Sequence, residues 1–232
     1  PLAPVDVVVM RASASEIEIG WRPAPPKKQM GEEVPQKIDI HGYEVYYEVE
    51  GSKPKKRLLD GSSESLVVKN LKPGQLVKGI SVKARNDAGW GPASQPEIQG
   101  RSTSAPPGQV DWIEVTEATA FTVTLQWSQP EESNGSEIDD YKVLQRVPGI
   151  DSSVVEFTTG SGECQHICFG LQPGTPYTFT VCAKNVSGWG PWVRLPTFTN
   201  TLSAPPNQPY DCKIVGTTVS TVEAAWRKPY SN

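Results

Sequence analysis

The side chains that could perform catalysis are few in this sequence, and they are scattered along it. A Ser–His–acid triad would have to use His41 or His166, which lie beside or within expected strands. Adjacent carboxylates stand in presumed loops, where such pairs are normally solvated: Glu32–Glu33, Glu131–Glu132 and Asp139–Asp140. No glycine-rich loop of the kind that cradles phosphate is present. We therefore expect that the chain is not an enzyme and has no catalytic residue.

The four cysteines are unevenly spread along the chain, at Cys164, Cys168, Cys182 and Cys212. We interpret them as small apolar or surface thiols, and one disulfide among the first three is the alternative. A zinc site is not expected, because the sequence has only two histidines and no CxxC pair. Calcium binding by the loop carboxylates is a minor alternative. We therefore expect no cofactor and no metal site.

Composition and charge narrow the classes of partner. The formal net charge of −4 argues against nucleic-acid binding, which needs a concentrated basic face. No apolar run reaches the roughly 18 residues that cross a bilayer, so no membrane insertion is expected within this chain. The chain begins at Pro1 without an initiator methionine, and we expect it to be a fragment of a longer protein. Other proteins are the expected partners.

Several landmarks recur along the chain at one spacing. SAPPGQ at Ser104 returns 99 residues later as SAPPNQ at Ser203, and Trp127 and Trp226 are also 99 residues apart. AGWGP returns as SGWGP at the same interval. The distance from Trp21 to Trp127 is longer, at 106 residues, which places an insertion in the first repeat. The chain is therefore a tandem array.

Within each repeat, short segments alternate apolar and polar residues, which is the period of a half-buried strand. In the first repeat these segments are EIEIGW (16–21), GYEVYYEVE (42–50), SLVVKNL (65–71) and GISVKARN (79–86). The second repeat has FTVTLQW (121–127), DYKVLQRV (140–147), SVVEFTT (153–159), HICFGL (166–171) and YTFTVCAKN (177–185). Segments rich in Pro, Gly and Ser separate them at the spacing of a β-sandwich. The pattern predicts an all-β protein.

Four short motifs follow in the same order in both repeats. A tryptophan in an early strand is followed closely by proline, and an aromatic third strand comes next. L-x-P-G and then V-x-A-x-N, with a later G-x-G, complete the series. Together the motifs resemble the fibronectin type III family. The resemblance implies tandem immunoglobulin-like, seven-stranded β-sandwiches: one module at 1–102, a second at 103–202, and the first two strands of a truncated third at 203–232.

Residues of these motifs are expected to form the core of each sandwich: Trp21, Trp127, Leu71, Leu171 and Tyr177. The tryptophans supply a large buried area between the two sheets. Tyr177 matches the tyrosine corner of the family, in which the hydroxyl reaches back to the chain near a turn. The first module has Val77 near this place, so its corner is expected to be looser.

The tryptophans of the two GWGP segments, Trp90 and Trp189, are expected in the loop before the last strand. Arg85 and Lys184 occupy outward positions of the preceding strand, so each indole can stack on a cation and clasp its own module. The alternative is contact with a partner, since interface hot spots favour Trp and Arg. Trp192 supports that alternative in the second module.

Two basic segments of the first module are further candidates for contact. The insertion between Trp21 and Tyr43 is long for a sandwich loop, and its Lys27 and Lys28 are candidate partner-contact residues. KPKKR at 53–57 is interpreted as a solvated hairpin, with attraction of a polyanion as the alternative.

The resemblance implies a function without catalysis. We expect spacer and interaction modules of a larger multidomain adhesion or receptor-like protein, placed outside the cell or at its surface. N-glycosylation sequons at Asn134 and Asn185 favour secretion slightly, although the second coincides with an asparagine that the family motif already contains. An intracellular scaffold of the muscle or cytoskeletal type is one alternative, and accessory modules attached to an enzyme are another.

Overall fold

The computed structural model describes residues 1–25 and 39–229, and these residues are all-β. The chain divides into two compact units: unit 1 comprises Pro1–Pro106 and Asn134–Glu137, and unit 2 comprises Pro107–Ser133 and Ile138–Asn232. The one helical segment within the described ranges is the short 3₁₀ turn η1, Asp151–Ser153. The prediction of an all-β protein is confirmed.

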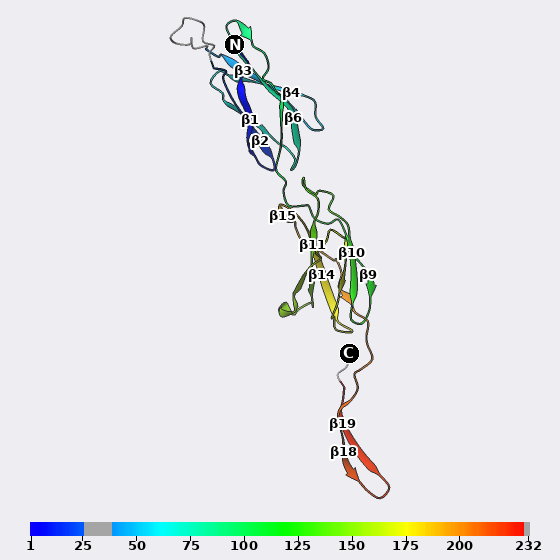
Figure 1. Ribbon diagram of the computed structural model, residues 1–232. Helices are drawn as coiled ribbons and strands as arrows, with labels where there is room; N and C mark the ends of the chain where they lie inside the picture. The colour runs from blue at the N-terminus through cyan, green and yellow to red at the C-terminus, as the bar shows by residue number, and fades with distance from the viewer. Residues whose placement is uncertain (26–38, 230–232) are drawn as a thin grey trace. The chain divides into compact units, whose positions relative to one another are not determined.

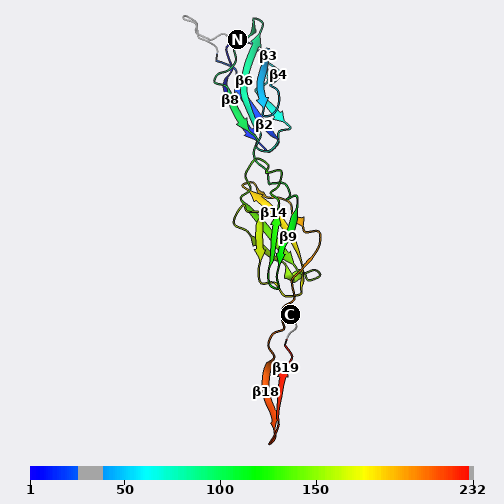
Figure 2. The ribbon, with the colours of Figure 1, turned by 90° about the vertical axis from the view of Figure 1, so that its right-hand side faces the viewer.

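Unit 1 is a sandwich of two antiparallel sheets (Figure 1). The first sheet has the order β1–β2–β5, with strands at Val5–Ala12, Glu16–Arg22 and Ser65–Lys69. The second has the order β4–β3–β6–β7, with strands at Lys55–Asp60, Gly42–Val49, Leu76–Asn86 and Gly89–Trp90. β8, Ile98–Arg101, also pairs with β6 (Figure 2). Counted as one interrupted strand, β7 and β8 complete the predicted seven.

Strict alternation of side chains builds the core of unit 1. Tyr43, Val45 and Tyr47 of β3 are buried, while the residues between them are half-exposed. Across the sandwich, Ile19 and Trp21 of β2 are buried as well. The rings of Trp21 and Tyr43 meet with centroids 5.4 Å apart. The two sheets are therefore joined by aromatic and β-branched side chains, as the sequence pattern predicted.

Unit 2 repeats this arrangement. Its first sheet has the order β13–β10–β9, with strands at Gln165–Cys168, Val123–Trp127 and Ile113–Ala118. Its second sheet has the order β12–β11–β14–β15, with strands at Val155–Thr158, Asp140–Arg146, Pro176–Asn185 and Gly188–Trp189. Two short strands also pair with β14: β16 at Val193–Arg194 and β17 at Thr199–Asn200. The rings of Trp127 and Tyr141 lie 5.2 Å apart at the centre of this core.

The motif residues expected in the cores are between 1 % and 6 % exposed: Trp21, Trp127, Leu71, Leu171 and Tyr177. A different side chain closes the corner of each unit. In unit 2 the backbone N–H of Gln172 donates to the hydroxyl of Tyr177 at 2.9 Å. In unit 1 the corresponding N–H, that of Lys72, donates to Oε1 of Gln75, also at 2.9 Å. The corner of unit 1 was expected to be looser, yet Gln75 supplies the hydrogen bond that a tyrosine would have made.

The last described strands form a two-stranded hairpin, with β18 at Tyr210–Thr217 and β19 at Val222–Arg227 (Figure 1). Trp226 is 61 % exposed, whereas Trp21 and Trp127, at the same place in their own repeats, are 3 % and 1 % exposed. A hairpin alone has no second sheet against which to bury such a residue. The segment thus has the pattern of a module's first two strands without its core.

Candidate functional site

Among the described residues, the two histidines have partners that are not nucleophiles. In unit 1, Nδ1 of His41 lies 3.2 Å from Oδ1 of Asp87, on the turn after β6. In unit 2, the ring of His166 packs against Phe157 with centroids 5.5 Å apart. Burial lowers the pKa of His166, so its imidazole is held in the neutral form. Neither geometry resembles a base beside a nucleophile.

Among the carboxylate pairs singled out in the sequence, Asp139 and Asp140 have structural contacts. Oδ1 of Asp140 accepts hydrogen bonds from the hydroxyl of Thr159 and the N–H of Gly160, both at 2.9 Å. Asp139 lies 3.4 Å from the ammonium group of Lys184. Among the described residues no group of three or more His, Cys, Asp or Glu side chains could hold a metal ion. Glu32–Glu33 lies outside the described residues.

All four cysteines are described, and each is a free thiol. Burial raises the pKa of Cys168 to about 12 and that of Cys182 to about 11. The thiolate is the reactive form, so these two thiols are protonated and inert at neutral pH. The Sγ of Cys164 lies 3.3 Å from the hydroxyl of Tyr141, and Cys212 is exposed.

Trp189 is clasped by its own sheet. The ammonium groups of Lys142 and Lys184 lie 4.7 and 5.7 Å from the centre of its ring. Lys184 is on β14 and lies opposite Trp189, and Lys142 is on the next strand, β11. Lys142 is fixed in turn by Glu156, whose Oε1 is 2.6 Å away. Two cations over one indole leave Trp189 half-buried, which matches the clasp predicted from the sequence.

Among the described residues a single cation lies over the ring of Trp90, and this side chain is more exposed to solvent than Trp189. The guanidinium carbon of Arg85 lies 5.8 Å from the centre of its ring, and the side chain is 45 % exposed. The place that Lys142 holds in unit 2 is occupied here by Glu44, which lies 3.6 Å from Lys56 and cannot stack on an indole as a cation does. The clasp of unit 1 is therefore partial.

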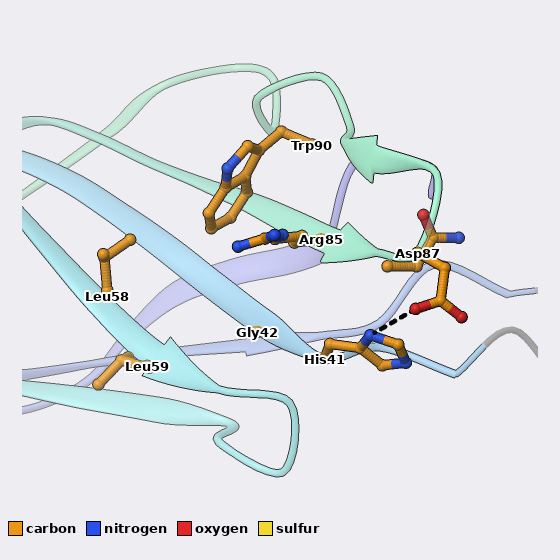
Figure 3. Close-up of a pocket in the computed structure, with 8 residues that line it drawn as sticks. His41, Gly42, Leu58, Leu59, Arg85, Asp87 and Trp90 are labelled. Atoms are coloured by element: carbon orange, nitrogen blue, oxygen red, sulfur yellow. Dashed lines mark ion pairs between the residues drawn. The ribbon is translucent and has the colours of Figure 1, made fainter.

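A shallow depression of about 440 Å³ lies beside Trp90. Figure 3 shows the indole lying over Arg85, with Leu58 pointing toward the same side of the sheet and Leu59 pointing away. Leu58 is 70 % exposed, and His41 with Asp87 borders the other end. We call Trp90, Arg85, Leu58 and His41 the Trp90 surface. It combines an aromatic ring, an aliphatic side chain and a cation around a hollow.

Gly42 lines the hollow at a position where the backbone leaves little room for a side chain. Gly42 on β3 lies opposite Arg85 on β6, which in turn lies opposite Trp90 on β7. A Cβ at position 42 would come within 2.9 Å of the Leu59 carbonyl oxygen. In unit 2 the same place in the row holds Asp140. This difference was not predicted, although GYEV in one repeat and DYKV in the other display it. The two repeats thus present different outer faces on one fold.

The other candidate residues stand as follows. Trp192 is 43 % exposed in unit 2, and Lys27 and Lys28 lie outside the described residues. Asn185 is fully buried, and its Nδ2 donates to the carbonyl of Ser133 at 2.9 Å. A glycan on that nitrogen would disturb this bond. The Nδ2 of the half-buried Asn134 likewise donates to the carbonyl of Pro106, at 2.7 Å, so a glycan there would break a hydrogen bond as well.

Comparison with known proteins decides the family. The model of the fibronectin type III domain matches residues 2–99 and 105–199. The chain belongs to the fibronectin type III family. Both of its fibronectin type III matches include the tryptophan, L-x-P-G and GWGP motifs from which the resemblance was inferred.

Relatives of these fibronectin type III repeats are long proteins. Human Protein sidekick-1 is 28 % identical over 99 % of this chain and 10 % of its own length. Mouse Protein sidekick-1 is 30 % identical over 90 % of this chain and 9 % of its own length. Rat Receptor-type tyrosine-protein phosphatase F is 27 % identical over 97 % of this chain and 12 % of its own length. The chain therefore spans about a tenth of the length of these relatives.

Among solved structures, a two-domain fibronectin type III segment from chicken tenascin is 18 % identical, with a TM-score of 0.41 over 85 % of this chain and 99 % of that one. Within residues 1–25 and 39–229, no helix is long and apolar enough to cross a membrane.

Proposed function

We propose that the two units are non-catalytic spacer and interaction modules of a larger adhesion or receptor-like protein, at the cell surface or outside the cell, and that unit 1 binds another protein through the Trp90 surface. The name of one relative, Receptor-type tyrosine-protein phosphatase F, supports a receptor setting. The same name supports attachment to an enzyme domain as a further arrangement, in which these units would still be the part that makes contacts.

The observation that carries the proposal is the open hollow next to an exposed indole. Trp90 is 45 % exposed and Leu58 70 % exposed, and Arg85 lies beneath the ring. Trp and Arg are the residues most enriched at interface hot spots, where they fill or border pockets that exclude water. A side chain of a partner can enter the space above Gly42 and pack on both the indole and the leucine.

Binding to live cells tests the proposal. The whole chain is clustered on fluorescent beads, and bead binding to cells of the source species is measured by flow cytometry. Trp90→Ala is expected to lower binding about tenfold or more, as loss of a hot-spot side chain does. Trp112→Ala is the matched control, because Trp112 is equally exposed, at 45 %, but belongs to unit 2.

The same experiment has a protease control and an outcome that would contradict the proposal. Protease treatment of the cells beforehand is expected to abolish binding, because the proposed partner is a protein. If Trp90→Ala binds as the unaltered chain does, the Trp90 surface is not the contact, and the proposal fails.

An intracellular scaffold is the second candidate, because all four cysteines are free thiols. Free thiols are typical of reducing compartments, whereas extracellular modules more often carry disulfides. Labelling intact source cells with a membrane-impermeant biotin reagent separates the two candidates. The parent protein is labelled if the units lie outside the cell, and it is labelled only after lysis if they form an intracellular scaffold.

A further inference from the structure

The outer strand of the second sheet in unit 2, β12, has one edge without a partner strand. Within the described residues, β12 pairs with β11 alone. The backbone N–H of Thr159 donates to the carbonyl of Tyr141 on the β11 side at 2.9 Å. Hydrogen bonds alternate along an antiparallel strand, so Phe157 also directs its N–H and C=O to β11. The N–H and C=O groups of Glu156 and Thr158 therefore point away from the sheet, and we call this side of β12 the free edge.

The side chains near the free edge are largely apolar. Val154 and Val155 are exposed, and Glu156 is the one charged residue of β12. Phe157 is half-buried, and its ring packs on that of His166 with centroids 5.5 Å apart. Unpaired backbone groups beside apolar side chains are the combination that allows an edge strand to pair with another chain.

In unit 1 the corresponding edge is protected by charge. Arg57 of β4 occupies the place of Phe157, since each lies opposite the valine that follows the buried tyrosine of the neighbouring strand by two residues. Lys55 and Lys56 precede Arg57 directly. Lysine and arginine on an edge strand oppose pairing with another chain, and residues 154–159 contain neither of them and no proline. The fold therefore tolerates a protected edge, and unit 2 has an unprotected one.

We propose that β12 pairs antiparallel with β12 of a second copy of this chain. A two-fold axis through Phe157 places this residue opposite itself and Glu156 opposite Thr158 of the second copy, and the converse pair completes the symmetry. In this register the backbone groups that point outward from the two copies face each other. They form two hydrogen-bonded residue pairs, with about four hydrogen bonds between the strands.

The neighbouring two-fold registers are less favourable. A register with Glu156 opposite itself sets two like charges against each other, which destabilises strand pairing. A register with Val155 opposite itself would place Ser153 in the ladder, and Ser153 belongs to the 3₁₀ turn η1, whose backbone is not extended. The register through Phe157 avoids both conflicts.

Side chains also meet favourably across this axis. Phe157 would stand in a pair without direct hydrogen bonds, in which Cβ atoms are about 4.5–5.5 Å apart, so the two rings pack on each other. The ring of His166 in each copy extends that contact. The charge of Glu156 is balanced within its own copy by Lys142, at 2.6 Å, so pairing covers no lone charge at this residue.

The contact is small. A few hydrogen bonds and one aromatic pair cover less than the roughly 1,200 Å² of a stable complex, so the dimer is expected to form and separate readily. Where many copies are held side by side, such contacts add to one another. The inference rests on unit 2 and not on the Trp90 surface, so either proposal can fail without the other.

Sedimentation equilibrium of the whole chain, over concentrations from about 1 to 500 µM, tests the proposal. A monomer–dimer equilibrium with a Kd on the order of 100 µM is expected. Phe157→Arg is expected to raise this Kd about tenfold or more, because two guanidinium groups would then meet on the axis. Phe169→Arg is the matched control, since Phe169 is exposed in the same unit but lies outside β12, and it is expected to leave the Kd unchanged.

A second variant tests the backbone bonds themselves. Thr158→Pro removes an N–H that points to the free edge and that β11 does not use, and proline is tolerated on edge strands for this reason. It is expected to raise the Kd about tenfold or more while the Tm stays within about 3 °C. If this variant does not fold, Phe157→Arg still decides the point, because unit 1 already carries arginine at the same place.

Disulfide trapping tests the register, in a Cys212→Ser background that removes the exposed thiol. Phe157→Cys is expected to give a covalent dimer on mild oxidation, because Cα atoms of such a pair lie about 4.5 Å apart, within the range of a disulfide. Thr158→Cys is expected to give at least about fivefold less, since its counterpart lies two residues away along the strand. A chain that stays monomeric, a dimer that Phe157→Arg and Thr158→Pro leave intact, or equal trapping at both positions would overturn the proposal.

Discussion

Among the described residues, the indole of Trp189 lies under two ammonium groups, at 4.7 and 5.7 Å, whereas that of Trp90 has one guanidinium at 5.8 Å. The difference comes from a single place in the sheet, where unit 2 has Lys142 and unit 1 has Glu44. Residues on a neighbouring strand therefore decide whether the same GWGP motif fixes its tryptophan or leaves it available to a partner.

Removal of each indole should separate these two roles. Trp189→Ala is expected to cost about 1 kcal/mol or more, because it ends two cation–π contacts, and to lower the Tm of unit 2 by about 5 °C. Trp90→Ala is expected to stay within about 0.5 kcal/mol, as surface substitutions usually do. Scanning calorimetry of the whole chain measures both. A larger loss for Trp90→Ala would show that its ring is chiefly structural.

Thiol labelling should divide the four cysteines by burial. With iodoacetamide at pH 8, Cys212 is expected to react quickly, because it is exposed. Cys168 and Cys182 should react only after unfolding, since burial raises the pKa of their thiols to about 12 and about 11. Peptide mass spectrometry of native and urea-treated samples gives the rate at each site. Rapid native labelling of Cys168 would contradict the burial described here.

At the scale of the strand and turn, two unlike side chains perform one task. The hydroxyl of Tyr177 and the amide of Gln75 each accept the first N–H after the leucine of L-x-P-G. Gln75 also donates to the carbonyl of Glu50 at 2.9 Å, which ties the corner to the end of β3. The corner needs an acceptor at this point, and either residue can supply it because the turn brings both within reach.

Loss of either acceptor should destabilise its own unit. Tyr177→Phe and Gln75→Ala are each expected to lower the free energy of unfolding by about 1 kcal/mol, the usual net value of a hydrogen bond. The controls are Gln172→Ala and Lys72→Ala, because these residues contribute only their backbone N–H to the bond. Urea denaturation followed by tryptophan fluorescence gives the values. If Gln75→Ala has no effect, its bond is replaced by water.

The sequence was sufficient to predict the strands, but not which side chains meet on the outer faces of the sheets. Alternation in EIEIGW and GYEVYYEVE predicted β2 and β3 closely, because burial on one face dictates a period of two. The hollow beside Trp90 was not predicted, since it depends on which residue lies opposite Arg85. The side of the sheet that Lys55 and Arg57 face depends likewise on the register of β3 with β4. Register is set by pairing across the sheet, so it cannot be predicted from the sequence of either strand alone.

At the scale of the whole chain, the two units have the same fold but different residues on their outer faces. Unit 1 has the Trp90 surface and the cations Lys55, Arg57 and Lys69, while unit 2 has apolar residues at the positions of these cations, including Phe169 at 65 % exposure. The cores are alike in composition, so selection for the fold leaves these outer positions free to differ. Different ligands for the two units are the expected consequence.

The last prediction concerns the hairpin β18–β19, which forms a sheet of only two strands within the described part of the chain. Its residues are exposed along both strands, and Trp226 is 61 % exposed. Two strands alone are marginally stable in water, so their amide hydrogens should exchange within seconds, while those of β6 and β14 should resist exchange for hours. Hydrogen exchange read by mass spectrometry on the whole chain tests this. Slow exchange in the hairpin would mean that another surface covers it, either on this chain or on a second copy, and dilution would tell the two apart because only contact between copies weakens at low concentration.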